Sequence, residues 1–118
     1  MISTMSNLID FSSLNDMLYG DDDYIKEFAE AAVISFSEFK SNYSKYLSLR
    51  DETNLRRAGH KIKPVAQMLG LQLLIDEYEV GKSVIWEEKS DEVLNQSIEK
   101  VDEICSKILS ELEDMVSE

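Results

Sequence analysis

Apolar side chains recur every three or four residues along the stretch that follows three consecutive aspartates. The apolar positions are Ile25, Phe28, Ala32, Phe36, Phe39, Tyr43 and Tyr46. This spacing places them on one face of an α-helix, and the acidic start at 21–23 suits the positive end of the helix macrodipole. The pattern predicts one long amphipathic helix of about 25 residues that must bury its apolar face against other elements.

Other segments show the same helical spacing. A second helix is expected from near Thr53 to Gly70, where glycine can take the left-handed conformation that often ends a helix. Its apolar stripe is Leu55, Ala58, Ile62, Val65 and Leu69. A third helix is expected from Leu71 to a stop at Gly81, and a last one from near Ser90 to the C-terminal end. A short helix from Ser12 to Tyr19, closed by Gly20, precedes them all.

The fold class that follows is all-α. The chain of 118 residues has one Pro and four Gly, with almost no turn dipeptides and no alternation of apolar and polar residues, which argues against β-structure. Because each long helix is apolar on one face and the connections are short, we expect residues 1–118 to form one domain, an antiparallel four-helix bundle with a short N-terminal capping helix.

The connection from Gly81 to Lys89 is the only one long enough to be mobile. Its apolar residues Val84, Ile85 and Trp86 either fold as a loop over the end of the bundle or form an exposed apolar anchor for a partner.

Composition excludes several classes of function. With 24 acidic against 12 basic residues, the net charge of −12 repels nucleic-acid phosphates and anionic lipids, so we expect no nucleic-acid or membrane partner. One Cys and one His make a poor ligand set, so no metal site is expected, and Cys105 falls on an apolar stripe. The sequence has no secretory signal and no membrane-spanning run, which favours the cytoplasm. A monomer is expected because the apolar stripes are used within the bundle.

Charge is segregated along the chain. Between Thr53 and Ile75 there is no Asp or Glu, whereas this segment carries Arg56, Arg57, Lys61 and Lys63. His60 lies opposite the apolar stripe of the same predicted helix, so the imidazole is expected to face solvent. Helical spacing also gathers a set of residues around it. These neighbours are Arg56, Arg57, Lys63, Pro64 and Gln67.

Two interpretations of His60 are open. A single His on a polar helix face is usually a solvated residue. Against this, Gly59 stands in a helix interior where Ala would be more stable by ~1 kcal/mol, and it leaves room for another surface to approach the imidazole. The missing acids, moreover, would otherwise repel a phosphoryl group. These features favour a nucleophile for phosphate chemistry.

The segment Leu55-Arg56-Arg57-Ala58-Gly59-His60-Lys61-Ile62-Lys63-Pro64, followed by Leu69-Gly70, resembles the signature of histidine-containing phosphotransfer (HPt) domains. That signature is approximately A-H-x-L-K-G, with a further Gly ten positions after the His. The predicted helix order is also similar to the four-helix bundle of the family. Two positions depart from the pattern: Gly59 replaces Ala, and Pro64 stands where a small residue is usual, so we expect a local kink.

The resemblance implies a phosphorelay intermediate without autokinase activity. His60 would accept a phosphoryl group from an aspartyl phosphate of a receiver domain and pass it to another receiver, while Lys63 would stabilise the phosphoryl oxygens. Arg56, Arg57 and Lys61 would steer the acidic pocket of the receiver, on a docking face that includes Gly59, Pro64 and Gln67. The partners would be response regulator receivers and a hybrid histidine kinase. The chain would need no cofactor of its own, because the receiver supplies Mg²⁺.

Leu14 and Leu18 of the short first helix either contact that partner or cap the bundle. Two other functions are alternatives to a phosphorelay intermediate. In the phosphoacceptor domain of a histidine kinase an acidic residue follows the His, whereas Lys61 follows here, and 118 residues hold no nucleotide-binding segment. The remaining alternative is a non-catalytic helical adaptor that docks an acidic partner through its basic residues.

Overall fold

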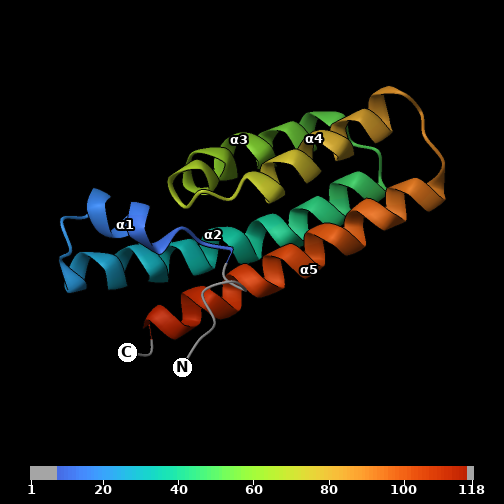
Figure 1. The fold of residues 1–118 in the computed structure, drawn as a ribbon. Helices are drawn as coiled ribbons and strands as arrows, with labels where there is room; N and C mark the ends of the chain where they lie inside the picture. Colours follow the sequence, from blue (N-terminus) through green and yellow to red (C-terminus); the bar gives the residue numbers. More distant parts are fainter. Residues whose placement is uncertain (1–7, 117–118) are drawn as a thin grey trace.

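The computed structural model describes residues 8–116, which fold into five α-helices and contain no β-strand (Figure 1). The helices are α1 (Phe11–Met17), α2 (Asp22–Ser48), α3 (Glu52–Met68), α4 (Gln72–Trp86) and α5 (Asp91–Val116). The all-α fold class is therefore confirmed, and the predicted starts of the helices are close to the observed ones.

Helices α2 to α5 form an antiparallel four-helix bundle. In Figure 1 the long pair α2 and α5 lies below the shorter pair α3 and α4. Helix α2 packs against α3 and α5, and α4 packs against the same two helices, so each helix has two neighbours. Short turns join consecutive helices and reverse the chain direction each time. This arrangement leaves one side of α3 exposed to solvent over its whole length.

The short helix α1 caps one end of the bundle. It lies beside the first part of α2, beyond the end of the α3 and α4 pair (Figure 1). Leu14 is only 1% exposed, and the N–H of Asp10 donates to the carbonyl of Leu69 over 2.8 Å. The N–H groups of Leu8 and Ile9 donate to the Glu111 carboxylate on α5. The capping helix is thus tied to both layers of the bundle.

Local sequence signals set the helix ends. Asp10, Asp21 and Asp51 are N-caps whose carboxylates accept backbone N–H bonds of the first turn. The Asn54 side chain and its N–H both bond Asp51 and hold the pKa of that carboxyl below its usual range. At the other end of α3, Gly70 has φ +68°, and the N–H of Leu71 donates to the carbonyl of Ala66 over 2.9 Å. The left-handed helix end predicted at Gly70 is confirmed.

The predicted apolar stripes form the core. The large side chains buried almost completely come from all four long helices and from α1. They include Leu14, Phe36, Tyr43, Leu47, Leu55, Leu69, Leu74, Val84, Val101, Cys105, Ile108 and Leu112. Burial raises the pKa of the Cys105 thiol to about 12, so this cysteine stays protonated and serves as packing.

The predicted helix stop at Gly81 is wrong. Helix α4 continues through Gly81 to Trp86. A Cβ atom on Gly81 would overlap the hydroxyl and ring of Tyr43, which is 0% exposed and has no space to move. Gly81 therefore allows the backbone of α4 to approach Tyr43 closely. It does not end the helix, as the sequence had suggested.

The same correction applies to the expected mobile connection. Val84, Ile85 and Trp86 belong to the last turn of α4 instead of a loop. Val84 is fully buried, Ile85 packs against the core, and Trp86 is 75% exposed at the end of the bundle. The connection between α4 and α5 shrinks to residues 87–90.

A buried polar chain joins three helices at the Gly81–Tyr43 contact. The Ser97 hydroxyl of α5 donates to Glu77 Oε2 of α4 over 2.7 Å. The Tyr43 hydroxyl of α2 lies 2.6 Å from Ser97 Oγ, in a second hydrogen bond of the chain, and also donates to the backbone carbonyl of Glu77 over 3.1 Å. Within the described part of the chain, every buried side-chain nitrogen or oxygen has a hydrogen-bond partner. The chain of bonds fixes the depth at which the Tyr43 ring sits.

We predict that Gly81→Ala destabilises the bundle, although the same change in an exposed helix interior stabilises a protein by about 0.5–1 kcal/mol. The added methyl group must displace Tyr43, at a cost of about 1–3 kcal/mol. Urea denaturation followed by circular dichroism measures the difference. In a Tyr43→Phe background the penalty becomes smaller, because one of the overlapping atoms is gone. A stabilising effect of Gly81→Ala would contradict this packing.

Candidate functional site

His60 projects from the solvent-exposed side of α3, in the middle of the helix. Leu55, Ala58, Ile62 and Ala66 on the other side are buried, so the predicted orientation of the imidazole is confirmed. Val65 is half-buried, and Ala66 fills the stripe beside it. Among residues 8–116 the structure records no hydrogen bond or ion pair of the His60 side chain. The ring is therefore accessible to a reagent or a partner.

Several predicted site residues share this exposed side. We call it the His60 face, and its members are Arg56, Arg57, His60, Lys61, Pro64 and Gln67, all of them exposed. They lie three or four residues apart and therefore side by side on the helix. Lys63 is half-buried one turn after His60. Helix α3 continues through Pro64 to Met68 as one α-helix, so Pro64 does not end it.

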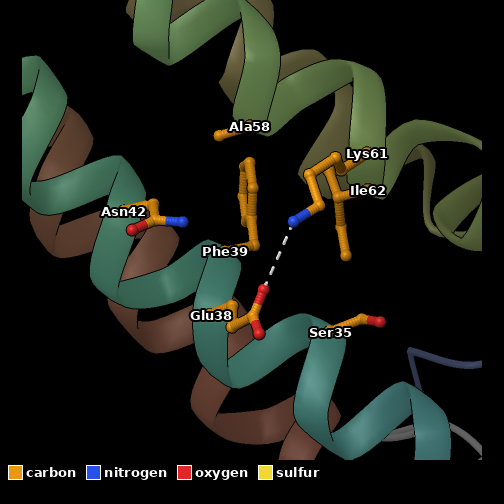
Figure 2. A pocket seen from close by; sticks show the side chains of 7 residues that line it. All are labelled: Ser35, Glu38, Phe39, Asn42, Ala58, Lys61 and Ile62. Atoms are coloured by element: carbon orange, nitrogen blue, oxygen red, sulfur yellow. Dashed lines mark ion pairs between the residues drawn. The ribbon is translucent and has the colours of Figure 1, made fainter.

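Although the middle of α3 contains no acidic residue, two of its cations form ion pairs with glutamates. Arg56 pairs with Glu52 of its own first turn over 3.0 Å. Lys61 pairs with Glu38 Oε1 of α2 over 3.5 Å, as Figure 2 shows. Arg57 lies close enough to Asp51 to contribute to the lowered pKa of that carboxyl. Neither Arg57 nor Lys63 has a recorded ion pair or hydrogen bond within residues 8–116.

These ion pairs leave the cations available. Both pairs are solvent-exposed, and exposed pairs contribute only about 0–1 kcal/mol. An incoming anionic group can therefore replace Glu38 or Glu52 at small cost. Lys63 has no recorded contact to break before it binds an anion.

The expectation that Gly59 leaves room for a partner is wrong. Gly59 is buried, and a Cβ atom there would overlap the ring and hydroxyl of Tyr78 from α4. The clearance serves contact between α3 and α4, not approach to the imidazole from solvent. The sequence held a signal for this, because Gly59 is four residues after Leu55 and three before Ile62, both on the apolar stripe.

Tyr78 is a site residue that the sequence analysis missed. Its hydroxyl donates to the carbonyl of Arg56 over 3.5 Å, and its ring meets Phe39 of α2 edge-on at 6.4 Å between centroids. Burial raises the pKa of the Tyr78 phenol; the nearby Glu79 adds to this and Arg56 opposes it. The phenol thus remains a neutral donor beneath the helix that carries His60.

A small pocket lies beside the His60 face, between α2 and α3. Its volume is about 60 Å³, enough for one small side chain or a few waters. Figure 2 shows Phe39 standing between the two helices and Lys61 reaching toward Glu38 across the pocket. The lining residues are Ser35, Glu38, Phe39, Asn42, Ala58, Lys61 and Ile62. Through Lys61, this pocket connects the His60 face to the polar groups of α2.

The first helix contributes little to such a surface. Leu14 is buried and Leu18 packs half-buried against the core, so these residues cap the bundle, and the proposal that Leu14 contacts a partner is wrong.

Within residues 8–116 no group of three or more His, Cys, Asp or Glu residues is placed to hold a metal ion. No helix in the same range is long and apolar enough to cross a membrane.

Comparison with known proteins adds no relative. No protein-family model matches the chain, and no curated protein and no solved structure matches it.

We predict that diethyl pyrocarbonate modifies His60 completely in the folded protein, at about the rate of an unstructured histidine peptide. His60 is the only histidine of the chain, so the ultraviolet difference absorbance of the modified imidazole reports this residue alone. His60→Gln gives no signal and serves as the control. A ring that reacts only after unfolding in urea would contradict the exposed geometry.

Proposed function

We propose that this chain is a phosphohistidine carrier of the HPt kind, which receives a phosphoryl group on His60 from an aspartyl phosphate of a receiver domain and passes it to another receiver. The observation that supports this most is an accessible imidazole in the middle of a rigid helix, with an unpaired Lys63 one turn away. The HPt-like segment that contains both residues supports it as well. We place the carrier in the cytoplasm, as a monomer that works between a hybrid histidine kinase and response regulators.

In the proposed reaction this chain provides the nucleophile, one charge-balancing lysine and a docking surface. A nitrogen of the neutral His60 ring attacks phosphorus in line with the bond to the aspartate. The N–P bond forms as the P–O bond breaks, and the electron pair leaves with the aspartate carboxylate. Lys63 balances charge on the transferred oxygens, while the receiver provides Mg²⁺ and its own acidic pocket. Arg56, Arg57 and Lys61 attract that pocket, and Pro64 and Gln67 lie in the contact area.

We predict that His60→Gln abolishes labelling of the chain by a receiver that carries radiolabelled acyl phosphate, while binding to the receiver persists. The label on the unmodified protein is stable in mild base and lost in mild acid, as a phosphoramidate is. Gel autoradiography after acid and base treatment measures both properties. A chain that binds receivers but is never labelled would support the adaptor function instead.

We predict that Lys63→Ala slows transfer to His60 about tenfold, a loss of ~1.4 kcal/mol of transition-state stabilisation. The matched control is Lys100→Ala, which removes the same charge from an exposed position on α5. Rapid-quench kinetics at saturating receiver compare the two variants, and circular dichroism checks that both are folded. Equal rates for the two variants would show that Lys63 has no special role.

A further inference from the structure

Two tyrosines in this bundle pack against glycines inside helices. The Gly81–Tyr43 contact joins α4 to α2, and the Gly59–Tyr78 contact joins α3 to α4. In both cases a Cβ atom on the glycine would overlap the tyrosine ring and hydroxyl. The second contact differs from the first in one respect: Gly59 immediately precedes His60.

The backbone of His60 lacks its usual support on one side. In an α-helix the carbonyl of residue 60 accepts the N–H of residue 64, but Pro64 has none to donate. The N–H of residue 60 bonds in the same ladder to the carbonyl of residue 56. That Arg56 carbonyl also receives the Tyr78 hydroxyl, at 3.5 Å. Tyr78 therefore contacts the helix at Gly59 and at the carbonyl to which His60 is bonded.

Tyr78 is itself held from three sides. It is 5% exposed, its ring meets Phe39 of α2 edge-on, and Lys82 Nζ lies 5.0 Å from the ring centroid. The Tyr78 ring is thus a fixed wedge between α2 and α3. It lies close to the part of α3 where the hydrogen bond from residue 64 to the carbonyl of residue 60 is missing. If the wedge were removed, the backbone of Gly59 and His60 would gain space to move.

We propose that Tyr78 is a positioning residue for His60, holding the backbone of α3 so that the imidazole keeps one direction toward the incoming phosphoryl group. The consequence for transfer rate rests on the proposed function, whereas the consequence for the orientation of the imidazole does not. Displacement of a reacting group by about 1 Å lowers rates by up to 10²-fold, so this support bears directly on phosphoryl transfer.

The test compares the two glycine–tyrosine contacts. Tyr78→Leu opens space under His60, whereas Gly81→Ala strains the other contact, which involves neither α3 nor His60. For Tyr78→Leu we expect the transfer rate at saturating receiver to fall about tenfold with KM changed by less than about twofold, because the His60 face is untouched. For Gly81→Ala we expect wild-type kinetics in the folded fraction, despite its lower resistance to urea.

Two further variants test whether the space filled by the Tyr78 ring is what matters. Tyr78→Phe keeps the ring and should retain most of the rate. In the double variant Gly59→Ala with Tyr78→Leu, the new methyl group fills part of the space and should restore part of the loss. Wild-type kinetics in folded Tyr78→Leu, or an equal loss of rate in Gly81→Ala, would overturn the proposal.

A measurement without phosphate separates this proposal from the proposed function. The ring signals of His60, the chain's only histidine, are followed by ¹H–¹⁵N NMR in each variant. We expect them to shift and broaden in Tyr78→Leu but not in Gly81→Ala. If the wild-type chain is never labelled by any receiver, the proposed function fails while this result still supports positioning. Unchanged ring signals in Tyr78→Leu would overturn positioning whatever the labelling shows.

Discussion

Close contact between tyrosine rings and helix backbones sets the geometry of this bundle. Helix α4 takes part in both contacts, since it offers Gly81 to Tyr43 of α2 and inserts Tyr78 against Gly59 of α3. Each tyrosine keeps its hydroxyl paired: Tyr43 in the chain with Ser97 and Glu77, and Tyr78 at the carbonyl of Arg56. Burial raises the pKa of both phenols, so neither carries charge into the core. These contacts set how closely α4 approaches α2 and α3.

The candidate site follows from the packing of α3. Because one side of α3 packs on α2 and α4, the other side presents His60 with cations around it. The field there is weaker than the sequence suggests, since Glu52 and Glu38 pair with Arg56 and Lys61. No recorded partner within residues 8–116 compensates the charge of Lys63. His60 is thus an accessible nucleophile with an unpaired cation one helical turn before it, Arg57, and another one turn after it, Lys63. Such a face suits a group that arrives already activated on another protein.

Apolar periodicity was enough to predict the bundle, the orientation of His60 and the helix end at Gly70, because these depend on local pattern. It failed at Gly59 and Gly81. The sequence shows that glycine is unfavourable within a helix, but it does not show the compensating close contact with a tyrosine ring of another helix. The same limit applies to charge. The absence of acids between Thr53 and Ile75 is real along the chain, yet Glu38 reaches Lys61 from α2. Tyr78 looked like an ordinary core residue, since its contact with the backbone before His60 exists only in three dimensions.

A chase experiment is the sharpest test of the proposal that His60 carries phosphate between proteins. The chain is labelled on His60 with radioactive phosphoramidate, freed of the donor, and mixed with Mg²⁺ and purified unlabelled receiver domains of the source organism. We expect the label to leave His60 and to appear as a base-labile acyl phosphate on the aspartate of at least one receiver. Label that stays on the chain, or that is lost only as inorganic phosphate at the same rate with and without every receiver, would contradict it.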